Sequence, residues 1–431
     1  MKNILLTLFF LLFIPSSAFA QNLLQALKEA YNNNTELNAE RENLFISEQD
    51  LKISKSEYLP SATITSSKSQ EDTNKLTNQS GGDATINDVD PLSTSIKIEQ
   101  TLVDFGRGAD YQKKKIGIDL AKAKLSKKEQ DIIYKAIEAY TGLITAKEKE
   151  EINRKSVELK ISQLETDRIR LERGEVKLSD LAQSESSLAG AEAQYIQSKS
   201  EVVTSKLNYE NVIGKVNENN LKKSIQSIVN IPSTLENAIE LSKKNNHDIK
   251  IAELELNQAE KDITIAKSDL APTASLSLER SYTEDLSTTY DEREKDVLKA
   301  TVSWPFYSGG KKFATLDKNQ SIKIRQRLLL DNAIKNNLTG VTSAWSNLLS
   351  SESFLNSVRA QVKAAEIANE GITAEYLSGA GSRSTLDLIQ SNSLLLNAQI
   401  SLANSERNYL LAQYNLLKSV GLLTSSYLNL K

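Results

Sequence analysis

The sequence has no cysteine, only one histidine and six prolines among its 431 residues. The absence of cysteine excludes disulfides, thiolate metal sites and thiol nucleophiles. The single histidine, His247, removes the usual ligand of a metal centre and the commonest general base. Aromatic residues make up 6% and hydrophobic residues 39%, which is low for a chain with several ordinary cores. We therefore expect no catalytic residues, no metal site and no cofactor, and the chain is not expected to be an enzyme.

The charge is nearly balanced, with 53 basic and 56 acidic residues, which gives no reason to expect a nucleic-acid partner. Residues 1–20 read as a signal peptide: Lys2 is followed by a short apolar run and by the small-x-small site Ala18 to Ala20. The apolar run is shorter than the roughly 20 residues of a transmembrane helix. No later segment is apolar enough to span a bilayer, so an exported chain of this kind could sit in a membrane only as a β-barrel.

The chain is a tandem duplication, with repeats at about 21–232 and 233–431. At an offset of 212, Ala26 matches Ala238 and Pro60 matches Pro272. At an offset of 207, Gly174 matches Gly381. This period is far longer than that of a solenoid repeat, so each half is a unit of several elements.

Proline placement divides each repeat into helical and non-helical parts. No proline occurs from Pro91 to Pro232, or after Pro305, and these stretches favour long helices over 107–173 and 311–377. Each would be about 100 Å long, which exceeds a globular core. Apolar and small residues recur every seven positions after them, which is typical of supercoiled helices. The small members of this repeat are Ser184, Ala191, Ser198, Ser205, Ser391, Ala398, Ser405, Ala412 and Ser419.

The segments between the prolines alternate apolar and polar residues, which predicts strand pairs at about 61–70 with 92–102, and at about 273–282 with 296–306. Alternation over about ten residues is typical of transmembrane β-strands. Trp304, Phe306 and Tyr307 cluster at one strand end, as interfacial aromatics do. Four strands cannot close a barrel, so each chain must share one with copies of itself.

The duplicated order of helix, Leu-Pro or Ala-Pro, strand pair, long helix, glycine turn and helix resembles the TolC-type outer-membrane efflux proteins. The residues that carry this resemblance are Tyr58-Leu59-Pro60, Leu270-Ala271-Pro272, Trp304 to Gly310 and Ser384 to Leu388. The resemblance implies a mostly α fold: a coiled-coil α-barrel continuous with a homotrimeric, twelve-stranded β-barrel. It also implies passive export through the outer membrane of a Gram-negative bacterium, with the tunnel extending into the periplasm. The implied partners are a periplasmic adaptor (membrane fusion) protein, an inner-membrane transporter and outer-membrane lipid.

Asp387 is the main candidate for the periplasmic aperture. It is either a helix-capping carboxylate, with Ser384 three residues before it, or one of three acidic residues in a ring. The resemblance implies a second acidic position at 390, where this chain has Gln390. Tyr376, Arg383 and Asp180 match positions that resemble the closing contacts between helices in the family.

The two helical turns are candidate adaptor contacts. The first comprises Gly174, Glu175, Val176 and Lys177, and the second comprises Gly379, Ala380, Gly381 and Ser382. Glycine after a helix end is typical of a C-terminal cap, and the resemblance adds the docking of the adaptor. An alternative function is a periplasmic coiled-coil scaffold or adaptor without a pore. It would explain the helices but not the duplicated strand pairs.

Overall fold

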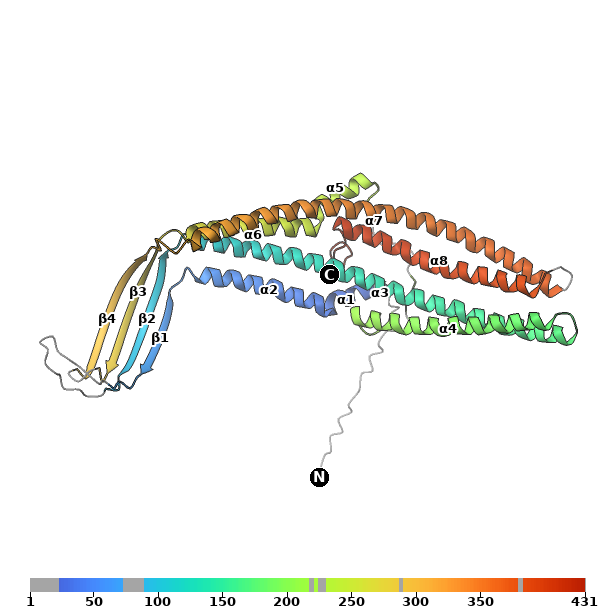
Figure 1. Cartoon of the computed structure of the whole chain (residues 1–431), viewed down its shortest axis with the longest axis horizontal. Helices are drawn as coiled ribbons and strands as arrows, with labels where there is room; N and C mark the ends of the chain where they lie inside the picture. The colour runs from blue at the N-terminus through green and yellow to red at the C-terminus, as the bar shows by residue number, and fades with distance from the viewer. Residues whose placement is uncertain are drawn as a thin grey trace, which may run out of the picture. The chain divides into compact units, whose positions relative to one another are not determined.

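The computed structural model describes residues 23–72, 89–216, 221–223, 230–286, 290–378 and 383–430. The expected signal peptide at 1–20 lies outside the described residues. Eight helices and four strands occur in these ranges (Figure 1), in the order α1 (Leu23–Asn33), α2 (Thr35–Ser56), β1 (Ser61–Lys68), β2 (Leu92–Val103), α3 (Arg107–Glu172), α4 (Leu178–Val212), α5 (Leu235–Asn245), α6 (His247–Ser268), β3 (Thr273–Glu284), β4 (Glu292–Ser303), α7 (Lys311–Ser378) and α8 (Thr385–Val420).

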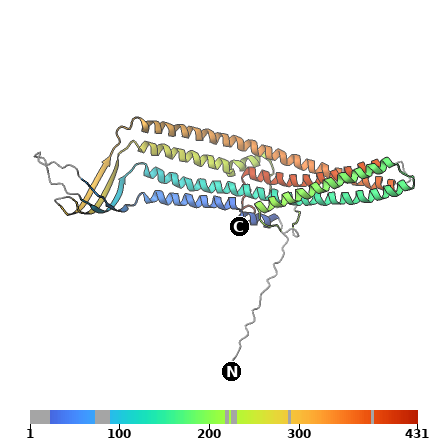
Figure 2. The same ribbon diagram turned by 60° about the horizontal axis from the view of Figure 1, so that its bottom comes forward.

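The predicted mostly α fold with four strands is confirmed, and the order of elements is the same in both halves of the chain. The long helices α3 and α7 have 66 and 68 residues, within one residue of each predicted end. In Figures 1 and 2, α4 lies beside the second part of α3, and α8 lies beside the second part of α7. Among the helices of the described ranges, none has a stretch long and apolar enough to cross a membrane.

The α3–α4 turn ends α3 with a Schellman motif. Gly174 has a φ of +72°, a conformation that glycine adopts without a steric penalty. Its amide donates to the carbonyl of Leu171, and the amide of Glu175 donates to the carbonyl of Arg170, each at 2.9 Å. The predicted glycine cap at this turn is therefore observed. Residues 379–382 of the second turn lie outside the described residues.

The four strands form one antiparallel sheet in the order β1-β2-β3-β4, which leaves β1 and β4 as its edges. Residues paired across the ladder share a face, and alternate residues lie on opposite faces. We call the face with the apolar side chains the apolar face; these are Ala62, Ile64, Ile96, Ile98, Ala274, Leu276, Leu278, Leu298, Ala300 and Val302. The other face, mostly serine, threonine and charged residues, is the polar face.

The β3–β4 hairpin differs from the predicted ranges. β3 continues to Glu284, and β4 runs from Glu292 to Ser303 rather than from 296 to 306. The ladder continues through charged pairs such as Arg280 with Asp296, because backbone pairing in a hairpin does not depend on apolar side chains. At the other end, Pro305 has no amide hydrogen to donate and follows the last ladder pair.

Short links join the sheet to the helices. Asp104 accepts hydrogen bonds from the amides of Gly106 and Arg107, at 2.8 and 3.3 Å, and so caps the start of α3. A Cβ at Gly106 would lie 2.4 Å from the Ser268 hydroxyl, so any larger residue here would force the Ser268 side chain to move. The Arg107 guanidinium donates to the carbonyl of Thr101 at 3.1 Å. These contacts fix the direction of α3 where it leaves β2.

The chain forms two compact units. The sheet unit comprises 39–127 and 247–337, and its helices pack around Leu120, Ala123 and Leu254. The helix unit comprises 1–38, 128–246 and 338–431, and buried clusters in its described parts include the following two. One cluster consists of Ala238, Val341, Ala344, Leu348, Ala412, Leu416 and Val420; the other consists of Val358, Val362, Ala365 and Ala398.

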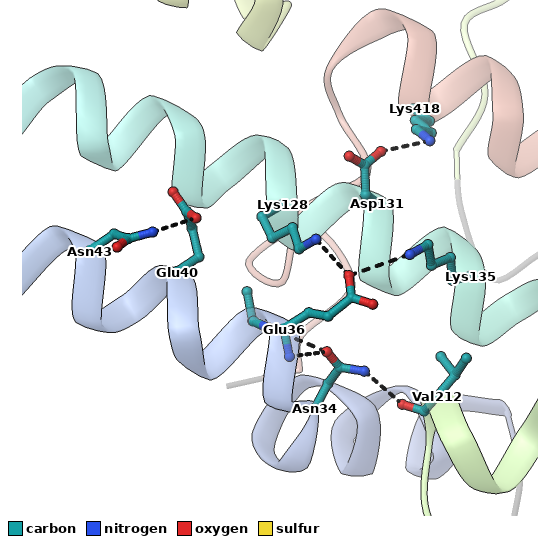
Figure 3. A network of polar contacts seen from close by, with 10 residues as sticks. Asn34, Glu36, Glu40, Asn43, Lys128, Asp131, Lys135, Val212 and Lys418 are labelled. Carbon is teal, nitrogen blue, oxygen red and sulfur yellow. Dashed lines mark hydrogen bonds and ion pairs between the residues drawn. The ribbon is translucent and has the colours of Figure 1, made fainter.

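Polar contacts in the helix unit surround the turn between α1 and α2 (Figure 3). Glu36 accepts from Lys128 at 2.6 Å and from Lys135 at 3.4 Å. The hydrogen bond from Lys128 is the largest cause of the lowered pKa of Glu36. Lys418 of α8 pairs with Asp131 of α3 at 2.7 Å, so α3 is tied to both neighbours by ion pairs.

Candidate functional site near the helix hairpin turns

A buried carboxylate lies five residues before the end of α3, in the helix unit. The side chain belongs to Asp167, whose exposed fraction is 0%. Gln163 donates from Nε2 to both carboxylate oxygens at 2.9 Å, and Ser184 of α4 donates its hydroxyl to Oδ2. These donors satisfy much of the acceptor capacity of a group that is costly to bury without partners.

Tyr376 of α7 completes this contact. Its hydroxyl donates to Asp167 Oδ1 and lies 3.1 Å from the Thr385 hydroxyl of α8. Burial, followed by the hydrogen bond to Asp167, raises the pKa of Tyr376, so its hydroxyl stays protonated and can donate at neutral pH. The four helices of the two hairpins therefore meet in one polar cluster, to which α3, α4, α7 and α8 each contribute a residue.

Arg170 covers the other side of the tyrosine. Its guanidinium lies 4.5 Å from the centre of the Tyr376 ring, and it pairs with Glu175 in the turn at 3.2 Å. Stacking on the ring is worth about 0.5–1 kcal/mol at an exposed site and more when desolvated. Arg170 thus connects the α3–α4 turn to the buried cluster.

Asp387 lies in the first turn of α8 and forms a capping box with Ser384. The Ser384 amide and hydroxyl donate to Asp387 Oδ2 at 2.8 and 2.9 Å, and the Asp387 amide donates to the hydroxyl at 3.2 Å. The backbone hydrogen bond from Ser384, followed by its hydroxyl, lowers the pKa of Asp387. Within one chain, Asp387 therefore makes the contacts of a helix-capping residue.

The other aperture candidates lie close to the hairpin turns. Asp180 accepts from the Lys177 amide at 2.9 Å at the start of α4, the counterpart of the Asp387 cap. Arg383 pairs with Glu375 of its own hairpin at 2.7 Å, and this hydrogen bond raises the pKa of the guanidinium. Gln390 is exposed, one turn beyond Asp387. Only Tyr376 among these candidates contacts the buried Asp167 cluster.

The candidate adaptor contacts in the first turn are accessible. Gly174, Glu175 and Lys177 are exposed, and Val176 is half-buried. Gly379, Ala380, Gly381 and Ser382 of the second turn lie outside the described residues.

The aromatic residues after β4 are exposed in the sheet unit, as membrane-interface side chains are expected to be. Trp304 and Phe306 contact each other edge to face, with ring centroids 5.9 Å apart. The Trp304 indole donates to the carbonyl of Leu270 at 3.1 Å. Phe306 and Tyr307 are 85% and 84% exposed, which within a single chain leaves large apolar surfaces uncovered.

Asp167, Gln163 and Thr385 were not among the site residues predicted from the sequence. The sequence does contain a sign of a polar contact in α3. Starting from Ala146, every seventh residue is polar, namely Asn153, Lys160 and Asp167, and all four residues are buried. Three polar residues at a position that is otherwise apolar or small in a heptad pattern indicate a polar contact inside the bundle.

A family model described as outer membrane efflux protein matches residues 26–215 and 238–422. The chain belongs to the outer membrane efflux protein family. It is 24% identical over 417 residues to the outer membrane efflux protein BepC of Brucella suis biovar 1, covering 96% of this chain and 88% of BepC. It is 23% identical over 433 residues to the outer membrane protein TolC of Escherichia coli K12, covering 94% and 83% of the two chains.

Other relatives of this family member are named for secretion. The alkaline protease secretion protein AprF of Pseudomonas aeruginosa is 22% identical over 443 residues, covering 100% of this chain and 91% of AprF. Among solved structures, the CmeC outer membrane channel of Campylobacter jejuni has a TM-score of 0.82 at 16% identity, covering 93% and 86% of the two chains. VceC of Vibrio cholerae has a TM-score of 0.76 at 15% identity, covering 93% and 96%.

Family membership confirms the predicted resemblance, the outer-membrane localisation and the channel function in efflux or secretion. The single chain shares its fold with the solved channels, as the resemblance predicted. The family consists of outer-membrane channel proteins rather than enzymes.

Proposed function

We propose that this chain is one third of a homotrimeric channel through which substrates leave passively across the outer membrane. The observation that carries the proposal is the sheet: it has one apolar and one polar face, and its edges β1 and β4 have no partner within the described chain. Unpaired backbone groups in a bilayer cost several kcal/mol each, so open edges must be paired. Three copies give a closed barrel of twelve strands, with the apolar face toward lipid and the polar face toward the lumen.

The test is assembly and conductance of the purified protein in detergent. Chemical cross-linking should stop at three chains, and the trimer should conduct ions in a planar bilayer. A conducting monomer would overturn the trimeric barrel. A protein that stays soluble without detergent and conducts no ions would instead support the scaffold alternative.

The contact between Asp167 and Tyr376 supports a closed state of the periplasmic end in this proposal. It joins the two hairpins close to both turns, through a buried carboxylate whose partner lies 209 residues away in the chain. We include Asp387, Gln390, Arg383 and Asp180 as residues of the aperture, where three copies of Asp387 would form an acidic ring. Opening would separate the two hairpins, breaking the bond to Tyr376 while Gln163 and Ser184 remain beside Asp167.

The turns would receive a periplasmic adaptor that joins the channel to an inner-membrane transporter. Glu175, Val176 and Lys177 lie beside Gly174 in the described turn, with Gly379 to Ser382 as the second contact. A photoreactive residue at Lys177 should cross-link a co-expressed adaptor, whereas the same residue at Lys155, within α3, should not. Equal cross-linking at both positions would contradict docking at the turns.

A further inference from the structure

Charged residues of opposite sign lie on opposite faces of β4. Glu292, Glu294 and Asp296 are on the same face as the apolar residues Leu298, Ala300 and Val302, but closer to the β3–β4 hairpin loop. Arg293, Lys295 and Lys299 are on the polar face. Because side chains alternate along a strand, this order of charges separates them completely.

The polar face of the sheet carries an excess of positive charge. Its charged residues are four cations (Lys97, Arg293, Lys295 and Lys299) and two anions (Glu99 and Glu279), a net charge of +2 per chain. Both carboxylates neighbour Lys97, since Lys97 Nζ is 2.8 Å from Glu99 Oε2 and Lys97 pairs across the ladder with Glu279. On its other side Glu279 pairs with Val297, between Lys295 and Lys299, and forms no ion pair with either within the described residues. The remaining excess therefore lies on β4.

The three cations of β4 face neutral partners. Arg293 pairs across the ladder with Thr283, Lys295 pairs with Ser281 and Lys299 pairs with Ser277. None of the three forms an ion pair within the described residues. The opposite edge strand, β1, offers only Ser61, Thr63, Thr65 and Ser67 on its polar face. A neighbouring copy that placed β1 beside β4 would thus add no carboxylate to this face.

We propose that Arg293, Lys295 and Lys299 make the membrane section of the lumen cationic, and that the exit therefore favours anionic solutes. This inference rests on the proposed trimeric barrel, in which three copies bring nine such side chains around one axis. The three positions on each strand span about 20 Å. Low-dielectric walls focus the field of such charges, and rings of arginine and lysine select anions in other pores. The substrate class that this exit suits is small organic anions with carboxylate or phosphate groups.

The test is block of the reconstituted channel by inositol hexakisphosphate, added on the side of the β-hairpin loops. From that side the probe reaches Arg293 and Lys295 first, so its block does not depend on charges at the helix hairpin turns. The wild-type channel should be blocked, and the block should weaken as the salt concentration rises. The triple variant Arg293→Gln, Lys295→Gln and Lys299→Gln should weaken the block by at least about tenfold.

The matched control removes the same number of charges from the other face of the same strand. Glu292→Gln, Glu294→Gln and Asp296→Asn should leave the block unchanged, because these side chains would point away from the lumen. Lys295→Arg with Lys299→Arg keeps the charge and should keep the block. If the triple variant does not assemble as a trimer, each single substitution should still weaken the block measurably.

The cationic exit would be overturned if the same concentration of inositol hexakisphosphate blocked the triple variant and the wild type. It would also be overturned if the control variant weakened the block as much as the triple variant. Either result would leave the channel itself established. A wild-type trimer without conductance would instead refute the proposed function, and the inference with it. The polycation spermine tests whether block depends on the charge of the probe rather than on its size. Added on the side of the β-hairpin loops, spermine should block the wild-type channel more weakly than inositol hexakisphosphate does. Stronger block by spermine would also overturn the inference.

Discussion

Asn34 donates a hydrogen bond from its side-chain amide to the backbone carbonyl of Val212 at 3.1 Å, joining the turn between α1 and α2 to the end of α4 (Figure 3). The duplicate of this contact is present in the second half of the chain, where Asn246 donates to the carbonyl of Ser419 at 3.2 Å. Carbonyls at a helix end lack partners within their helix. In both halves, therefore, an asparagine side chain donates to a backbone carbonyl at a helix end that lacks a partner within its own helix.

Replacing Asn34 with alanine should destabilise the helix unit by about 1–3 kcal/mol, because it removes a helix cap and leaves a carbonyl unpaired. The Asn34 Oδ1 also accepts from the amides of Glu36 and Leu37, at 3.0 and 3.2 Å. Asn34→Asp keeps these two bonds but loses the donor to Val212, so it should have a smaller effect. Thermal unfolding followed by circular dichroism measures both, and an unchanged midpoint for Asn34→Ala would contradict the role of the contact.

Gly421→Ala should be far more destabilising than Gly174→Ala, although both glycines have positive φ values, +85° and +72°. The added Cβ at 421 would lie 2.3 Å from the carbonyl oxygen of Asn245, whereas nothing lies within 4 Å of a Cβ at 174. The conformational penalty, about 1–2 kcal/mol, is shared by both substitutions. The difference between their unfolding midpoints therefore measures the clash at 421, and equal midpoints would show that the close approach is absent in solution.

Tyr376→Phe should increase the time that the channel spends open. The substitution keeps the ring under Arg170 but removes the hydroxyl that contacts Asp167 and Thr385. A buried hydrogen bond to a charged group contributes about 1.5–3 kcal/mol, enough to shift a two-state equilibrium by tenfold or more. Single-channel recording in a planar bilayer measures the open fraction.

The matched control for this prediction is Tyr195→Phe. The Tyr195 ring lies beside Lys199, and its hydroxyl makes no hydrogen bond within the described residues. Removing this hydroxyl should leave the open fraction at the wild-type level. If both variants open the channel equally, the contact with Asp167 does not hold it closed.

Asp387→Asn should weaken block by multivalent cations added from the periplasmic side while leaving trimer stability nearly unchanged. Asparagine still accepts from the Ser384 amide, so the cap persists and only the charge is lost. Gln390→Asp should strengthen the block by adding a second acidic level. Wild-type block in Asp387→Asn would mean that this carboxylate only caps α8.

The stability of the wild type and of Asp387→Asn should depend differently on pH, because only the wild type has a carboxylate in the α8 cap. Hydrogen bonds from Ser384 lower the pKa of Asp387 below its usual value of 3.8. Its contribution to stability is therefore complete above about pH 3.8 and is lost as the pH falls through the lowered pKa. The acid sensitivity of the wild-type unfolding midpoint should be larger than that of Asp387→Asn, which has no carboxylate to protonate at this position.

The long elements could be predicted because their signals are local. A stretch of more than sixty residues that lacks proline and is rich in helix formers predicts a helix whatever its partners are, and α3 and α7 end within one residue of the predicted positions. Apolar and polar residues alternate through β3, which predicts a strand and its faces. The strand ends were less accurate, because the ladder of β4 continues through Glu292 to Asp296, where alternation is between charges of opposite sign.

The buried cluster could not be predicted residue by residue, because its partners are distant in the sequence. Asp167 lies in a helix rich in lysine and glutamate, where an acidic residue is usually solvated. Only pairing with Tyr376, 209 residues later, distinguishes it. Asp387 shows the converse: Ser384 lies three residues before it, so the cap was predictable from the sequence.

The short link between β2 and α3 has a mechanical consequence. Three residues separate the end of β2 at Val103 from the start of α3 at Arg107, and Asp104 and Arg107 bond this link to both elements. Rotation of the first turn of α3 about the helix axis would break the hydrogen bonds that Asp104 and Arg107 make across this link, and β2 is itself held by strands on both sides. The sheet therefore acts as a torsional anchor. Twist that arises farther along α3 is therefore resisted at the point where the helix leaves the sheet.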